Sequence, residues 1–305
     1  MRVIAKKVKP ATLTSARPQV IDSCREATQL VNQARVAGKV VGLVPTMGAL
    51  HEGHLSLVRA ATEVCDYVVV SIFVNPTQFG PSEDLSQYPR TLSDDLEALS
   101  NYNVDLVFHP QENEIYPADF TTFVTAPKVG DDLEGKSRPG HFRGVATIVL
   151  QLFQILPTDL AFFGCKDYQQ CLVIRDMVRD LHVSTEVRSC PIIREADGLA
   201  MSSRNRYLSA SERKTALLIS KGLERAAECF AAGERDPRVL ENEVRQTLAE
   251  GPIDRVDYVA VRCAKTLRPL TEVATSAVVL VAAYVGSTRL IDNRQLRRES
   301  ESGLT

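Results

Sequence analysis

The chain has 305 residues, of which 44% are hydrophobic and 24% are charged, and its formal net charge is −2. That length is enough for a buried core in one large domain or two modest ones. The charge indicates no extended nucleic-acid surface, and no segment approaches the roughly 18 consecutive apolar residues of a membrane-spanning helix. We therefore expect no nucleic acid and no membrane among its partners.

The cysteines and the N-terminus both favour a reduced, cytoplasmic protein. The seven cysteines are an odd number and include no C-x-x-C pair, which disfavours a disulfide framework and a cysteine zinc site. The segment Met1–Pro10 is basic but has no long apolar stretch and no small-residue cleavage site. We therefore predict no signal peptide.

The hydrophobic pattern predicts strands that alternate with helices over the first two thirds of the chain. Residues 1–18 show little pattern and are predicted to form an arm, and helical spacing runs from Val20 to Ala37. The predicted strands are 40–44, 67–74, 104–109, 159–163 and 183–193, with a short extra strand over 120–126. The other predicted helices are one that includes 55–61 and those over 91–102, 141–156 and 168–181.

This alternation predicts an α/β fold, a Rossmann-like parallel sheet wrapped by helices, over residues 1–192. Beyond Arg194 the pattern changes. It predicts helices over 210–232 and 239–249 and strands over 256–261 and 277–285. We expect a smaller C-terminal α+β domain over 193–305 that acts as a lid, with a solvated tail from Arg297.

The segment Pro45–His54 (PTMGALHEGH) joins a predicted buried strand to a predicted helix. Unpaired N–H groups at a helix start favour an anion, and Gly48 and Gly53 let a ligand approach the backbone. His51 and His54 share one helix face, where two imidazoles can donate to phosphate oxygens as charge moves. An H-x-x-H pair could also be half of a metal site, but no third ligand lies nearby in the motif. The two histidines could instead be capping or core residues, although a pair around a glycine after a buried strand makes this the less favoured explanation. The glycines here do not form the G-x-G-x-x-G pattern, which disfavours a dinucleotide-binding dehydrogenase.

A second cluster lies in Asp159–Gln170 (DLAFFGCKDYQQ), where a strand is again followed by a glycine and a helix start. Lys166 is a compact positive charge that can reach a phosphate. Asp167 can accept from a ribose hydroxyl or cap the helix. An exposed Lys–Asp pair on a turn explains the same residues equally well.

A third cluster, Ala200–Tyr207 (AMSSRNRY), places two hydroxyls and two arginines in a polar turn near the predicted domain junction. Such a loop can close over a triphosphate and stabilise the charge on departing pyrophosphate. A capping loop before the helix at Ala210 is the alternative, and this segment alone does not decide between them.

Taken together, the clusters resemble the H-x-G-H nucleotidyl-transferase superfamily, with Met201–Arg204 (MSSR) as the counterpart of its K-M-S-K-S motif. More narrowly, the chain resembles the pantothenate synthetase (pantoate–β-alanine ligase) family from about residue 20 to about residue 296. The motifs that carry this resemblance are 45–55 (PTMGALHEGHL), 74–80 (VNPTQFG), 141–147 (HFRGVAT), 166–170 (KDYQQ), 194–208 (READGLAMSSRNRYL) and 289–293 (RLIDN).

The resemblance implies a ligase that forms pantothenate for coenzyme A biosynthesis. ATP and (R)-pantoate would give pantoyl adenylate and pyrophosphate, and the amine of β-alanine would then displace AMP. Charge builds up on the α-phosphate and on the departing pyrophosphate, so preorganised donors and cations suit the reaction. The family is typically a homodimer, and Mg²⁺ would mainly accompany the ATP phosphates.

The resemblance also implies residue roles. His54 would be the catalytic proton donor, and His51, Lys166 and Arg204 would act on the phosphates. The residues implied in ATP binding are Met47, Gly48, Gly53, His54, Gly164, Cys165, Lys166, Asp167, Ile193, Met201, Ser202, Ser203 and Arg204. Those implied in pantoate binding are Pro45, Met47, Phe73, Gln78 and Gln170. Asp94 and Asp95 lie where the family has acids near the metal, although acids at a helix start are an equally good explanation.

Two features depart from the family. Cys165 stands where the family usually has Glu. A backbone contact at this position would survive the change, whereas a role of the Glu side chain would not. The N-terminal arm extends about fifteen residues beyond the usual start. The rivals are a related adenylyltransferase or a small tRNA-synthetase relative, both lacking these paired glutamines, and a non-catalytic nucleotide-binding protein.

Overall fold

A computed structural model describes residues 17–81, 83–274 and 276–297 of the chain. Most of the predicted arm and of the predicted tail therefore lies outside the described residues. The chain divides into two compact units. The first comprises the chain up to Cys165 together with Val173–Pro191, and the second comprises Lys166–Leu172 together with the chain from Ile192.

The first unit is built on a six-stranded parallel sheet with the order β1-β4-β3-β2-β5-β6. The strands are β1 (Gln19–Ile21), β2 (Val41–Thr46), β3 (Tyr67–Ile72), β4 (Leu106–Phe108), β5 (Leu160–Gly164) and β6 (Glu186–Cys190). The central strands are almost entirely buried because helices cover both faces, and such strands are continuous apolar runs. The predicted Rossmann-like parallel sheet is confirmed.

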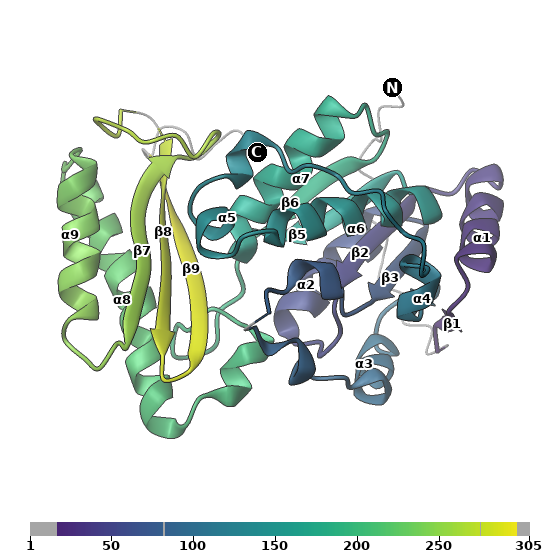
Figure 1. The fold of residues 1–305 in the computed structure, drawn as a ribbon, viewed down its shortest axis with the longest axis horizontal. Coiled ribbons are helices and arrows are strands. Elements are labelled where there is room, and N and C mark those ends of the chain that lie inside the picture. The colour runs from purple at the N-terminus through teal and green to yellow at the C-terminus, as the bar shows by residue number, and fades with distance from the viewer. Residues whose placement is uncertain (1–16, 82, 275, 298–305) are drawn as a thin grey trace. The chain divides into compact units, whose positions relative to one another are not determined.

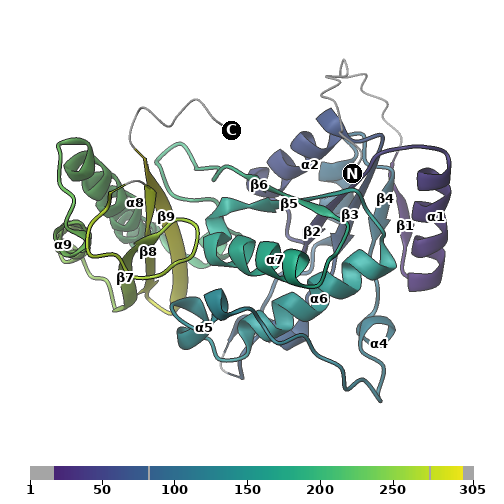
Figure 2. The same ribbon diagram turned by 90° about the horizontal axis from the view of Figure 1, so that it is seen from above.

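Helices cover both faces of this sheet, with α2 on one face and α6 on the other (Figure 2). The helices of eight or more residues are α1 (Cys24–Val36), α2 (Glu52–Val64), α3 (Leu92–Leu99), α6 (His141–Ile155) and α7 (Tyr168–Asp180), and short ones are α4 (Glu112–Ile115) and α5 (Glu134–Ser137). Gly144 in α6 has no room for a side chain, because a Cβ there would overlap the Thr77 carbonyl. The helix therefore packs directly on the turn Pro76–Gln78.

The second unit contains a three-stranded antiparallel sheet, β7-β8-β9, with α8 and α9 packed against it (Figure 1). Its elements are α8 (Ala210–Ala231), α9 (Pro237–Leu248), β7 (Arg255–Cys263), β8 (Ser276–Val285) and β9 (Thr288–Arg297). A capping box of Ser209 and Glu212 begins α8. This unit confirms the predicted α+β architecture.

Two expectations about secondary structure are wrong, and one strand was not predicted. Val20 and Ile21 belong to β1, which pairs with β4, so the first helix begins only at Cys24. Residues 120–126 form no strand, and there the Val124 N–H donates to Thr147 Oγ1 on α6 at 3.0 Å. The strand β9 was not expected, although the motif at 289–293 lies within it. Among the residues that the structure describes, no helix is long and apolar enough to cross a membrane.

Candidate active site

The turn between β2 and α2 has an unusual backbone. Gly48 has a φ of 80°, and Ala49 has a φ of 49°, in the left-handed region that a side chain disfavours. The Gly48 N–H donates to Thr46 Oγ1 at 3.2 Å, and this hydroxyl in turn donates to the Ser71 carbonyl of β3. The turn thus relies on contacts made outside its own sequence.

A single buried carboxylate holds the rest of this turn. Asp95 of α3 is 2% exposed, and its two oxygens accept from the N–H groups of Ala49 at 3.0 Å and Leu50 at 2.7 Å. Burial raises the pKa of Asp95, although its hydrogen bonds to the backbone and to Thr91 oppose the rise. The N–H groups of residues 48–50 are therefore bound within the protein.

The two histidines lie at the start of α2. His51 is the N-cap residue, and its Nδ1 accepts from the Gly53 N–H at 3.1 Å. Because Nδ1 accepts, the neutral ring carries its proton on Nε2, which is the donor that a phosphate oxygen requires. The ring centroids of His51 and His54 are 4.1 Å apart with a tilt of 31°. The structure thus brings together the pair expected on one face.

Of the residues implied in pantoate binding, Pro45, Met47, Phe73 and Gln78 belong to the first unit, whereas Gln170 belongs to the second. Pro45 lies within β2, Phe73 follows β3 with 7% exposure, and Gln78 ends the turn Pro76–Gln78. The Gln78 side chain donates from Nε2 to Met47 Sδ at 3.1 Å, and its Oε1 accepts from Asn75 Nδ2 at 3.0 Å. This amide is thus held between two side chains beside an apolar wall.

The backbone of Gln78 is fixed as well. Its carbonyl accepts from His141 Nδ1 at 2.9 Å, and His141 Nε2 accepts from Arg138 Nη1 at 3.0 Å. Arg138 also forms a two-bond ion pair with Glu83, at 2.8 and 2.6 Å. Burial and the nearby Arg138 charge lower the pKa of His141 to about 4, so the ring is neutral near pH 7.

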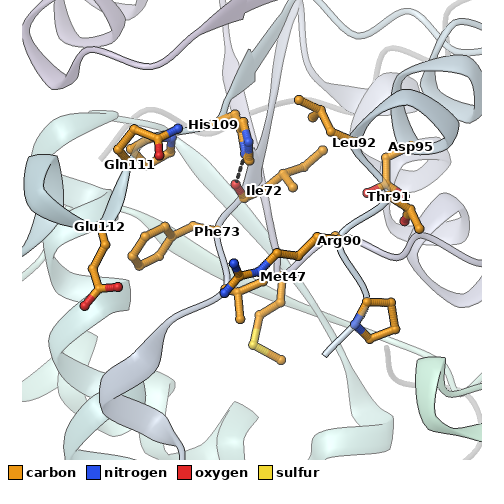
Figure 3. A pocket seen from close by; sticks show the side chains of 14 residues that line it. Met47, Ile72, Phe73, Arg90, Thr91, Leu92, Asp95, His109, Gln111 and Glu112 are labelled. Atoms are coloured by element: carbon orange, nitrogen blue, oxygen red, sulfur yellow. Dashed lines mark hydrogen bonds between the residues drawn. The ribbon is translucent and has the colours of Figure 1, made fainter. Parts of the chain in front are cut away.

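Met47 and Phe73 also line a pocket of about 270 Å³ (Figure 3). His109 lines it, with Nδ1 donating to the Ile72 carbonyl at 2.8 Å and Nε2 as the remaining nitrogen. Of its polar lining residues, only Asp95 was named from the sequence; the others are Arg90, Thr91, His109, Gln111 and Glu112. The sequence position of His109, Gln111 and Glu112 could have predicted their place. They follow a buried parallel strand, and such residues lie at the ligand-binding edge of the sheet.

The second cluster spans the end of β5 and the start of α7. Gly164 ends the strand, Cys165–Asp167 form a single 3-10 turn, and Gln170 lies in the first turn of the helix. Lys166 Nζ is 3.9 Å from Asp167 Oδ1, which is a long and weak ion pair. The two side chains thus form the Lys–Asp pair on a turn that was considered as an alternative. Because this pair is weak, the Lys166 ammonium can still bind a stronger partner.

The third cluster follows a hairpin in the second unit. Arg194 and Ala200 form a β-bridge, and the Met201 N–H donates to the Ile193 carbonyl at 3.0 Å. Ser202 then caps the 3-10 helix Ser203–Tyr207, its Oγ accepting from the Arg204 N–H at 3.2 Å. Lys166 and Ser202 line the same small cavity, so the second and third clusters meet within this unit.

The two candidate metal ligands differ in their surroundings. Asp94 is exposed, whereas both oxygens of Asp95 accept from backbone N–H groups. Across residues 17–81, 83–274 and 276–297, no three His, Cys, Asp or Glu side chains are grouped so that they could hold a metal ion. Of the two acids, only Asp94 is therefore exposed, whereas the oxygens of Asp95 are already used by the Ala49 and Leu50 N–H groups.

Comparison with known proteins decides the family. The family model described as pantoate-beta-alanine ligase matches residues 19–295. This chain belongs to that family. A pantothenate synthetase from Acidobacterium capsulatum is 56% identical over 253 residues, covering 83% of this chain and 85% of the relative. Another from Rhodopirellula baltica is 52% identical over 276 residues, covering 90% and 94%.

Solved structures of pantothenate synthetases share the fold. The crystal structure from Thermus thermophilus is 41% identical with a TM-score of 0.88, and the match covers 92% of this chain and all of that one. The enzyme from Francisella tularensis, complexed with beta-gamma ATP and beta-alanine, is 35% identical with a TM-score of 0.75 over 91% and 97% of the two chains. This chain is accordingly a pantoate–β-alanine ligase that uses ATP to join pantoate to β-alanine.

Proposed function

We propose that this ligase works through pantoyl adenylate. A carboxylate oxygen of (R)-pantoate attacks the α-phosphate of ATP, and pyrophosphate leaves. The amine of β-alanine then attacks the acyl carbon, AMP leaves with the oxygen, and the nitrogen loses a proton as the amide of pantothenate forms. The observation that supports this best is the His51–His54 pair on α2, where a donor-bearing imidazole adjoins a helix N-terminus.

We assign His54 as the proton donor and His51 as a phosphate ligand through Nε2–H. For pantoate, we assign Gln78 and Gln170 as amide hydrogen-bond partners. Pro45, Met47 and Phe73 would contact its apolar methyl groups. The contacts that hold Gln78 from both its side chain and its carbonyl support this assignment, because a fixed amide loses little entropy on binding.

The remaining assignments concern ATP. Lys166 and Arg204 would neutralise charge that develops on the phosphates. We assign the other contacts to Met47, Gly48, Gly53, Gly164, Cys165, Asp167, Ile193, Met201, Ser202 and Ser203. We further propose that the C-terminal domain acts as a lid and that the enzyme is a cytoplasmic homodimer. Mg²⁺ would enter bound to the ATP phosphates, with Asp94 as the more accessible acid of the Asp94–Asp95 pair.

The decisive experiment is pantoate-dependent exchange of labelled pyrophosphate into ATP without β-alanine. We expect exchange that requires pantoate and Mg²⁺, and addition of β-alanine should yield AMP and pantothenate. His54→Ala should lower the exchange rate by about 100-fold or more while ATP still binds. Exposed His182→Asn is the matched control and should leave exchange unchanged. ATP binding without any exchange in the wild-type protein would contradict the adenylate route.

A further inference from the structure

The motif Arg289–Asn293 (RLIDN) has two consecutive buried polar residues in β9. Asp292 is 5% exposed and Asn293 is 3% exposed, in a strand whose neighbouring positions are mostly apolar or partly exposed. Successive side chains of a strand point to opposite faces, so these two reach different parts of the unit. Burying an amide and a carboxylate is costly unless each is fully hydrogen-bonded.

Asn293 reaches the second cluster. Its Nδ2 donates to the Lys166 carbonyl at 2.9 Å, across 127 residues of sequence. The contact fixes the backbone of the residue whose ammonium we assign to the ATP phosphates. The chain enters α7 directly after it, where the Tyr168 hydroxyl donates to the Ala264 carbonyl at 2.8 Å. The start of α7 is thus tied to the second unit at two points.

Asp292 reaches the third cluster. Its carboxylate accepts from both terminal nitrogens of Arg194, at 2.7 and 3.0 Å, and Arg194 Nη1 also donates to the Gly198 carbonyl at 3.1 Å. This fork closes the hairpin that leads into Met201–Arg204. Asn205 secures the far end, with Nδ2 donating to Glu195 Oε1 at 2.7 Å and to the Ala200 carbonyl at 3.0 Å.

From these contacts we propose that Asp292 and Asn293 are positioning residues. They fix Lys166 and the Met201–Arg204 loop in place relative to each other. Asn293 bonds directly to the Lys166 carbonyl, and Asp292 acts through Arg194 on the hairpin that precedes Arg204. Preorganised charge is effective in catalysis because it costs no reorganisation when the charge moves, so loosening either support should slow turnover. The inference rests on the proposed roles of Lys166 and Arg204 in adenylation.

The test is a double-mutant cycle between Asn293 and Lys166. Asn293→Asp keeps the side-chain volume but turns the donor into an acceptor facing the Lys166 carbonyl. We expect kcat for pantoate-dependent exchange to fall about tenfold or more, with the KM for pantoate unchanged. In a Lys166→Ala background the same change should cost less than about twofold, because its effect passes through Lys166. Asn293→Ser, which keeps a hydroxyl donor, should lose less activity than Asn293→Asp and covers the case in which the latter does not fold.

The matched control is Arg294→Ala, which breaks the exposed ion pair with Glu224 at the next position of the strand and should leave kcat unchanged. Wild-type kcat in Asn293→Asp, or an equal fall in both backgrounds, would overturn the proposal, since a merely structural role is additive. If the wild-type protein showed no exchange, the proposed function would fail instead. The same cycle would then be measured on ATP affinity by calorimetry. An equal loss of affinity with and without the Lys166→Ala change would overturn the inference, and a loss seen only when Lys166 is intact would support it.

Discussion

The turn at residues 47–50 and the hairpin at residues 194–200 are both held by a buried aspartate from a distant segment, yet the two aspartates are balanced differently. Asp95 accepts two backbone N–H groups, with no cation among its hydrogen-bond partners in the described part of the chain. Asp292 is paired with the guanidinium of Arg194 at 2.7 Å. The turn at 47–50 thus depends on two acceptor oxygens of Asp95, and the hairpin depends on the planar guanidinium of Arg194, which donates two parallel bonds to Asp292.

This difference suggests that the same kind of substitution acts differently at the two places. An amide can replace neither arrangement fully. At Asp95 it opposes one of two backbone N–H groups with its own N–H, and at Asp292 it opposes either Arg194 or the Asn293 N–H. At Asp292 it removes charge while it leaves Arg194 a single acceptor. A buried aspartate can therefore hold a turn either through backbone N–H groups or through a guanidinium.

The largest effect is expected at Asp95. Asp95→Asn offers one acceptor where two N–H groups need one each, so the turn before His51 should loosen at a cost of about 2–3 kcal/mol. We expect kcat for pantoate-dependent exchange to fall about 100-fold. Glu97→Gln, at an exposed position of the same helix, is the control and should change little. If added Mg²⁺ restored Asp95→Asn, the carboxylate would be a metal ligand and the comparison would fail.

A smaller effect is expected at Arg194. Arg194→Lys keeps the positive charge but cannot donate two parallel bonds to Asp292 or reach the Gly198 carbonyl at the same time. We expect kcat to fall about tenfold and thermal stability to drop by about 1 kcal/mol, since one charged hydrogen bond is lost. Steady-state exchange kinetics and thermal melting measure both. Unchanged kinetics would show that the charge alone holds the hairpin.

The third prediction concerns pH and tests the first unit alone. The folded pKa of His141, about 4, lies below its ordinary value of 6.5, so the unfolded chain binds an extra proton between these values. The contribution to stability is thus present above about pH 6.5 and is lost as the pH falls toward 4, with a slope of at most about 1.4 kcal/mol per pH unit.

Urea unfolding of the wild type and of His141→Gln at several pH values isolates this term. The variant should lack the slope, and His182→Asn, which alters an exposed histidine, should retain it. A slope that survives in His141→Gln would mean that other groups cause the acid sensitivity.

The smallest effect is expected at Cys165, where the family usually has Glu. The residue lies in the 3-10 turn after β5, and burial together with the nearby Cys165 raises the pKa of the Cys190 thiol to about 11. If ATP contacts only the backbone there, Cys165→Glu should leave exchange within about twofold of wild type. A large gain in rate would assign a side-chain role to the family's Glu.

Local sequence was informative wherever a segment forms its own structure. The alternation of apolar runs with amphipathic segments predicted the parallel sheet, and the pair His51–His54 marked the start of α2. By contrast, β1 has three residues, too few for a pattern, and it is a strand only because β4 pairs with it. The segment 120–126 looks like a strand but bonds to a helix instead.

The sequence by itself determined the fold class, the family motifs and the residues that candidate chemistry requires, because helix and strand periodicity and short motifs are local properties of the chain. Only the tertiary structure decided what holds those motifs. Asp95 meets its turn across 45 and 46 residues, and Asn293 meets Lys166 across 127. Such contacts form when the core packs and leave no periodic trace, so a buried acid and a buried amide look ordinary until the fold brings their partners to them.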